Sequence, residues 1–147
     1  MMFDDDGEVN MQHVKRLWRN STIENGFGPV GNQLAALAKD PAAKKRSLEA
    51  RSTTVSLRKL HKLAGDELWI VRGFVADNPR TPVSILRALV YDESAYVRAM
   101  VAANVRTPIA DLYTLANDPE VQVRRAVAAN VDSPPEALAI IALLDRF

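Results

Sequence analysis

The chain of 147 residues contains no cysteine, and this absence excludes several kinds of chemistry at once. Without cysteine there is no disulfide framework, no thiolate zinc or iron–sulfur site and no cysteine nucleophile. Glycine is also scarce, with 6 residues against 21 alanines, which favours helices because alanine loses least on entering a helix. We therefore expect a single all-α domain over residues 1–147.

The sequence also lacks a dominant sign of charge and a long apolar run. Its 19 Lys and Arg oppose 18 Asp and Glu, so the net charge of +1 does not indicate a nucleic acid or an anionic membrane as partner. The longest mostly apolar stretch, residues 137–144, is about half of the roughly 20 residues that span a bilayer. Acidic residues stand where an export signal needs positive charge, at Asp4, Asp5, Asp6 and Glu8. We expect a cytoplasmic protein with no membrane contact.

A repeat of 26 residues is the strongest pattern in the sequence. Val-Arg pairs begin at Val71, Val97 and Val123, and the same shift superposes Val-Ala pairs, asparagines and Thr-Pro or Ser-Pro pairs. Leucines recur in the same phase. The pattern predicts helical repeats over residues 29–147, preceded over residues 1–28 by an N-terminal helix and a joint that contains glycine.

Each unit is expected to hold two helices, A and B, with chemical signals at their ends. Thr107-Pro108 and Ser133-Pro134 would start helix A with a hydroxyl N-cap, and Ser133 with Glu136 forms a capping box. Asp40-Pro41 and Asp118-Pro119 would start helix B with an anion at its positive end. Because a unit of this length is short for two helices, one of them is expected to be brief, in the α or the 3₁₀ form.

The pattern V-R-x-x-V-A-x-N-x-x-T-P-x-x-x-L-x-x-L-x-x-D resembles the variant leucine-rich repeat, a family of helical solenoids related in shape to HEAT and armadillo repeats. The units that begin at Val71, Val97 and Val123 match it well, whereas Lys45 and Glu49 occupy columns that hold valine later. The resemblance implies an α-solenoid, a curved superhelix of short two-helix repeats that serves as a scaffold or binding surface without a cofactor. The cysteine-bound cluster of some members has no ligands here.

Three recurring polar columns predict a structural ladder. Arginine follows aspartate by six residues in every unit, so we interpret the two as hydrogen-bonded pairs that align the stack rather than as phosphate-binding cations. Asparagine is expected to end helix B in a left-handed conformation, with its buried amide satisfying turn backbone groups. The columns are Asp40, Asp66, Asp92 and Asp118; Arg46, Arg72, Arg98 and Arg124; and Asn78, Asn104 and Asn130.

Basic residues concentrate in residues 44–62, where seven of them oppose only Glu49. Arg58, Lys59 and Lys62 share one face of a helix A and point to an anionic partner. Long cationic side chains also solvate helix faces, and no aromatic residue lies among them as single-strand binding would favour. The candidate partner-binding residues of the chain are Lys44, Lys45, Arg51, Arg58, Lys59, Lys62, Arg87 and Tyr113.

Columns that vary between units are the better guide to a partner, because a solenoid binds along its outward positions. We expect two such columns on helix A, namely His61, Arg87, Tyr113 and Ala139, and Lys59, Ile85, Asp111 and Ala137. The leading hypothesis is a scaffold without catalytic activity that binds a protein or peptide. The alternative is a HEAT-like module that binds nucleic acid through residues 44–62.

Signals for catalysis are weak. Gly26, Gly28 and Gly31 spell G-x-G-x-x-G, but a dinucleotide site needs a buried strand before that motif, and the preceding segment has helical spacing. His13 and His61 are not spaced as metal ligands or beside a nucleophile. We expect no catalytic residue, no metal and no cofactor.

The C-terminal segment is unusually apolar at positions that are polar one unit earlier. Ile140 takes the column of Thr114, and Leu143 takes the column of Asn117. Such a surface either folds under Phe147 or meets a second copy across a twofold axis. We expect a homodimer through this helix.

Overall fold

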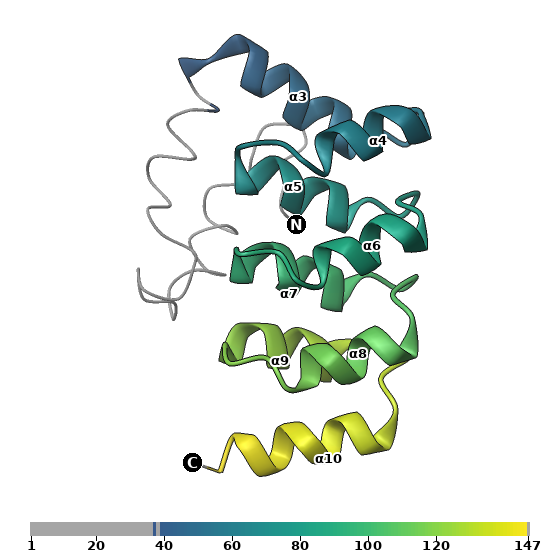
Figure 1. Cartoon of the computed structure of the whole chain (residues 1–147), viewed down its shortest axis with the longest axis vertical. Helices are drawn as coiled ribbons and strands as arrows, with labels where there is room; N and C mark the ends of the chain where they lie inside the picture. The colour runs from purple at the N-terminus through teal and green to yellow at the C-terminus, as the bar shows by residue number, and fades with distance from the viewer. Residues whose placement is uncertain (1–36, 38, 147) are drawn as a thin grey trace.

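The computed structural model describes residue 37 and residues 39–146. Helices alone make up the regular structure of this part of the chain, and no strand occurs in it. Figure 1 shows the helices stacked along the long axis of the molecule, with α3 at one end and α10 at the other. Their bounds are α3 Pro41–Arg51, α4 Leu57–Leu63, α5 Trp69–Asp77, α6 Val83–Leu89, α7 Ala95–Ala103, α8 Ile109–Ala116, α9 Val121–Ala129 and α10 Pro135–Leu144.

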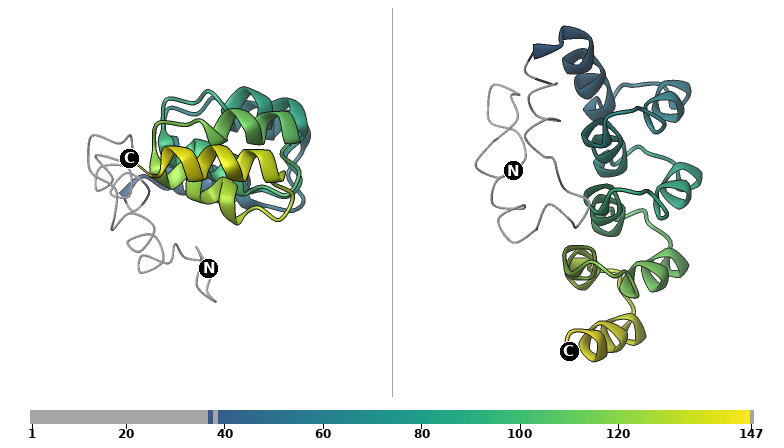
Figure 2. Two further views of the ribbon diagram at one scale, coloured as in Figure 1. Left: turned by 90° about the horizontal axis from the view of Figure 1, so that it is seen from below. Right: turned by 60° about the vertical axis from the view of Figure 1, so that its left-hand side comes forward.

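The helices form two rows along the stack (Figure 2). The B row consists of α3, α5, α7 and α9, in which each helix packs against the next. The A row consists of α4, α6, α8 and α10, and each of its helices packs against one or two helices of the B row. Both rows are α-helical, so neither helix of a unit takes the 3₁₀ form in the described residues. The predicted N-terminal helix, its glycine joint and Phe147 lie outside these residues.

One hydrophobic core runs between the two rows. On helix A the predicted apolar positions are buried, as Leu112 and Leu115 show for α8. Burial reaches around the whole helix only inside the B row, where α5 buries every residue from Trp69 to Ala76, whereas the last B-row helix, α9, buries only Val123 and Val127. The ring of Tyr96 on α7 lies against Trp69 at a centroid distance of 5.0 Å, and burial raises the pKa of its hydroxyl well above the usual value.

The start of helix A differs from the sequence prediction. Pro108, not Thr107, is the N-cap of α8, and the Thr107 hydroxyl donates to the carbonyl oxygen of Val101 at 2.5 Å. Ser133 donates in the same way at 2.6 Å, so the capping box with Glu136 is wrong. The last carbonyl groups of a helix lack partners within it, and these hydroxyls satisfy one such group at the end of each preceding helix B.

The start of helix B agrees with the prediction at one unit and differs at another. Asp40 caps α3, because its carboxylate accepts a hydrogen bond from the amide of Ala42 at 2.9 Å. Helix α9 begins at Val121 with Glu120 as N-cap, so the predicted start at Asp118 is wrong. Asp118 instead accepts from the amide of Glu120 at 3.0 Å and orders the turn that leads into the helix.

An asparagine is the C-cap of α5, α7 and α9, as predicted, but its backbone is extended rather than left-handed. At the end of α7, Asn104 has φ −73° and ψ 128°. Its Nδ2 donates to the carbonyl oxygens of Ala76 and Asn78, at 2.8 and 3.2 Å, around the end of α5. Its Oδ1 accepts from the amide of Arg106 at 2.8 Å. The buried amide therefore joins two turns, and Asn78 and Asn130 make equivalent bonds.

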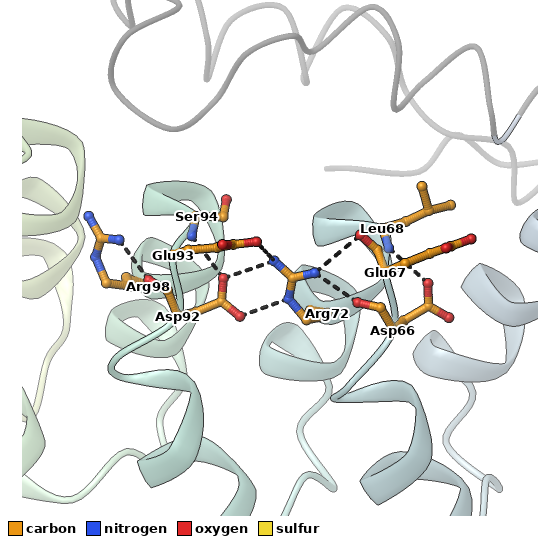
Figure 3. A network of polar contacts seen from close by, with 8 residues as sticks. All are labelled: Asp66, Glu67, Leu68, Arg72, Asp92, Glu93, Ser94 and Arg98. Atoms are coloured by element: carbon orange, nitrogen blue, oxygen red, sulfur yellow. Dashed lines mark hydrogen bonds and ion pairs between the residues drawn. The ribbon is translucent and has the colours of Figure 1, made fainter.

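The arginine and aspartate columns link successive units through a continuous chain of hydrogen bonds (Figure 3). Arg72 donates to both carboxylate oxygens of Asp92, at 2.8 and 3.1 Å, and to the carbonyl oxygen of Asp66 at 2.8 Å. Arg98 repeats this geometry with Asp118 and with the carbonyl of Asp92. The carboxylate partner thus lies twenty residues ahead, in the next unit, and the aspartate six residues back contributes its backbone.

The two ends of this chain of bonds involve more exposed side chains. Arg46 donates to Asp66 at 2.6 Å, and this hydrogen bond raises the pKa of the Arg46 guanidinium. Arg124 donates to Asp145 at 2.6 Å, beyond the last turn of α10. These arginines are bound to carboxylates of their own chain, so their contacts position helices.

Candidate functional site

The outward side of the A row is the candidate functional site. On α4, α6 and α8 the exposed positions are the first, second, fifth and sixth of the helix, and α8 keeps its fifth partly covered. Helical spacing places these four positions on one side, opposite the buried leucines. We call this surface the A face; it consists of Leu57, Arg58, His61, Lys62, Val83, Ser84, Arg87, Ala88, Ile109, Ala110, Tyr113 and Thr114.

One predicted outward column lies on the A face and the other does not. His61 and Arg87 are exposed and Tyr113 is partly exposed, in the register that was expected. In the second column Ile85 and Ala137 are buried, so its assignment to the surface is wrong. The second column lies two residues before the first one on each helix, and two residues correspond to a rotation of about 200° around the helix axis. The second column therefore lies at the edge of the core.

An apolar column on the A face has no counterpart among the predicted site residues. Leu57, Val83 and Ile109 are the first residues of α4, α6 and α8, and 51%, 36% and 55% of their surface is exposed. They recur at the 26-residue interval of the sequence. That recurrence is the signal that could have found them, but an apolar residue three positions before a core leucine resembles another core position.

The cations of residues 44–62 lie on two helices that pack against each other, α3 and α4. Arg58 and Lys62 are exposed on the A face, whereas Lys44 and Lys45 are exposed on α3 and Arg51 is partly buried at its end. Lys59 contacts Glu49 of α3 at 3.2 Å between Nζ and Oε2. The basic segment is therefore divided between α3 and α4, and of its cations Arg58 and Lys62 belong to the A face.

Polar contacts join the helices of the A row to one another at the edge of the A face. Arg87 Nε lies 3.4 Å from Asp111 Oδ2, linking α6 to α8. The hydroxyl of Tyr113 donates to Glu136 at 3.2 Å, linking α8 to α10. Partial desolvation, together with the charge and hydrogen bond of Glu136, raises the pKa of Tyr113. These two candidate residues thus hold a fixed orientation.

Within the described residues, no three His, Cys, Asp or Glu side chains gather in a group that could hold a metal ion. None of the helices in this part of the chain has the length and apolar character that crossing a bilayer requires. Comparison of the chain with protein-family models, with curated proteins and with solved structures gave no match.

Proposed function

We propose that the chain is an α-solenoid of 26-residue units, of the variant leucine-rich repeat type, and that it binds another protein or a peptide without catalysing a reaction. The observation that carries this proposal is that recurring columns and variable columns of the repeat occupy different places in the structure. Columns that recur from unit to unit make the contacts between helices, as Arg72, Asp92 and Asn104 do. The A face instead differs from unit to unit.

This division is what a binding scaffold requires. A stack of units stays regular only when each unit offers the next one the same contacts. Its surface is free to vary, and the A face changes from Arg58 and Lys62 on α4 to Ala110 and Thr114 on α8. A surface that differs along its length presents a partner with a specific pattern.

Nucleic acid is the second candidate, and the charge of the A face favours it. No acidic residue occupies the exposed positions of α4, α6 and α8. Two observations favour a protein instead: Lys59 is engaged by Glu49 of its own chain, and exposed apolar residues alternate with the cations. Phosphate binding weakens steeply with salt, whereas apolar contacts do not.

The test is capture from the source cells with the immobilised 147-residue chain and two variants. The first variant, Arg87→Glu with Tyr113→Ser, alters the A face. The matched control, Lys45→Glu with Leu48→Ser, makes comparable changes at exposed residues of α3. We expect a protein that the unaltered chain and the control retain and that the A-face variant loses.

Nuclease treatment and salt decide between the two candidates. Retention that survives nuclease and high salt supports a protein partner. A captured component that nuclease removes, together with loss of binding to RNA or DNA in an Arg58→Glu, Lys59→Glu, Lys62→Glu variant, overturns the proposal in favour of nucleic acid.

A further inference from the structure

We infer that the A face binds an extended acidic segment of a partner protein that carries regularly recurring apolar residues. This inference rests on the proposed function and adds the chemistry of the partner. Two observations support it: the line of apolar side chains, and the absence of exposed acidic residues on α4, α6 and α8 beside that line.

The apolar side chains form a line rather than a scatter. Leu57, Val83 and Ile109 stand at the same position of three successive A-row helices, and each has at least a third of its surface exposed. Isolated exposed apolar residues are ordinary in proteins, but repetition in register along one surface is typical of an interaction site. Covering the three side chains removes apolar surface from water at each helix, which favours association.

The charge beside this line selects an acidic partner. Arg58 and Lys62 lie on the exposed side of α4, and Arg87 lies on that of α6 with 59% of its side chain exposed. The one acid in these three helices, Asp111, has only 13% of its side chain exposed and is held by Arg87. Carboxylates between the apolar residues of a partner would face these cations, and a basic segment would be repelled.

The apolar line also distinguishes a peptide from a nucleic acid. A phosphate backbone gains nothing from Leu57, Val83 or Ile109, and bases would need aromatic side chains to stack on. The A face offers two aromatic rings, His61 on α4 and Tyr113 on α8, and the hydroxyl of Tyr113 is bound to Glu136 of α10. That carboxylate lies at the edge where a phosphate chain would continue past α8.

The recurrence of the apolar residues calls for a partner segment in which apolar side chains recur in the same way. In a polyproline II conformation every third side chain points the same way. A segment with an apolar residue at every third position therefore presents one apolar row to Leu57, Val83 and Ile109.

The experiment measures binding of a fluorescein-labelled (Leu-Glu-Pro)₄ peptide to the full chain by fluorescence anisotropy. Comparison peptides are (Ser-Glu-Pro)₄, which lacks the apolar residues, and (Leu-Lys-Pro)₄, which reverses the charge. We expect binding of the first peptide only. Ile109→Ser and Lys62→Glu on the A face should each weaken it about fivefold or more, whereas Leu48→Ser and Lys45→Glu on α3 should change it less than about twofold.

Each alternative gives a different result. Equal binding of (Ser-Glu-Pro)₄, or equal loss in the A-face and α3 variants, overturns the inference. Tighter binding of labelled oligo(dT), abolished by Lys62→Glu, overturns it in favour of nucleic acid. If the capture experiment yields an A-face-dependent protein that (Leu-Glu-Pro)₄ does not displace, the inference alone fails; if it yields no protein, the proposed function fails as well.

Discussion

The two inner helices of the B row, α5 and α7, differ from the helices of the A row in how much of each helix is buried. Helix α5 of the B row packs against α3, α4, α6 and α7, and it buries all residues from Trp69 to Ala76. Helix α6 of the A row packs mainly against α5 and α7 and buries Ile85, Leu86 and Leu89. A helix enclosed on several sides is constrained at nearly every position, whereas a helix packed on one side keeps an outward face on which the sequence can change.

If the A face binds a partner as we propose, this difference separates stability from recognition along the chain. A substitution in the B row, or in the hydrogen-bond chain that follows it, should change the free energy of unfolding. The same kind of substitution on the A face should leave stability nearly unchanged and act on binding. Three predictions test that separation, in order of decreasing effect on stability.

The largest effect is expected from Asp92→Ala. The substitution leaves Arg72, whose side chain is only 10% exposed, without its bidentate carboxylate, and it removes the acceptor of the Ser94 amide. We expect a loss of about 3 kcal/mol in the free energy of unfolding, because a buried charge that loses its nearest carboxylate is costly and the remaining carboxylate, Glu93, lies 3.8 Å away and is exposed. Urea denaturation followed by circular dichroism measures it.

The control for this prediction lies at the end of the same chain of bonds. Asp145 is 33% exposed, so Asp145→Ala should cost about 1 kcal/mol or less. Adding Arg72→Met to Asp92→Ala should restore part of the stability, because no buried charge then lacks a partner. Equal losses for Asp92→Ala and Asp145→Ala would show that burial does not set the strength of these pairs.

The second effect is steric and compares one column at two places in the B row. A Cβ on Gly73 would lie 2.1 Å from a ring carbon of the buried Tyr96, so α5 and α7 would have to separate. Alanine gains about 1 kcal/mol in helix propensity, but the overlap outweighs it, and we expect Gly73→Ala to destabilise by about 2 kcal/mol net. Thermal and urea unfolding of the variant measure the change.

The equivalent position on α9 is Arg125, which is exposed. Arg125→Ala should alter the free energy of unfolding by less than about 0.5 kcal/mol. The same column is therefore tightly packed inside the B row, at Gly73, and exposed on its last helix, at Arg125. A stable Gly73→Ala variant would mean that the two helices adjust their spacing freely, against the close packing of the B row.

The sequence indicated the two helices of each unit and the buried leucines because both depend on periodicity, which is a property of the chain itself. It did not indicate where polar side chains bond. Thr107 stands directly before a proline, where an N-cap is ordinary, yet its hydroxyl reaches the open carbonyl of Val101. The choice between two acceptors depends on how the chain turns between the helices.

The same limit explains the outward columns of helix A. Ile85 and Val83 are two residues apart and both apolar, and the sequence alone does not say which of them faces the core. The structure buries Ile85 and exposes Val83, because the packing of α6 against α5 and α7 fixes the rotation of the helix. Predicting the outward positions of helix A thus required the rotation of each helix about its own axis. The repeat pattern constrains that rotation only to within a residue or two.

The smallest effect on stability is expected at α10, where the prediction concerns self-association. Leu138, Leu143 and Leu144 are 40%, 60% and 43% exposed on this helix, so a second copy that covers them would remove apolar surface from water. We expect the 147-residue chain to sediment as a dimer at tens of micromolar. Leu143→Glu with Leu144→Glu should give monomers that keep the helical circular dichroism spectrum, because both side chains lie outside the core.

Two details make this sedimentation experiment decisive. Ile140 is avoided as a site because it packs against the core, so a charge there would confuse unfolding with dissociation. Leu48→Glu, on α3 at the other end of the stack, is the matched control and should sediment like the unaltered chain. A monomeric unaltered chain contradicts the predicted dimer, and an unaltered dimer in the double variant places the contact on another surface. In either case the exposed apolar residues of α10 would not be the dimer contact. They would then be open to a different protein, as we propose for the exposed apolar residues of α4, α6 and α8.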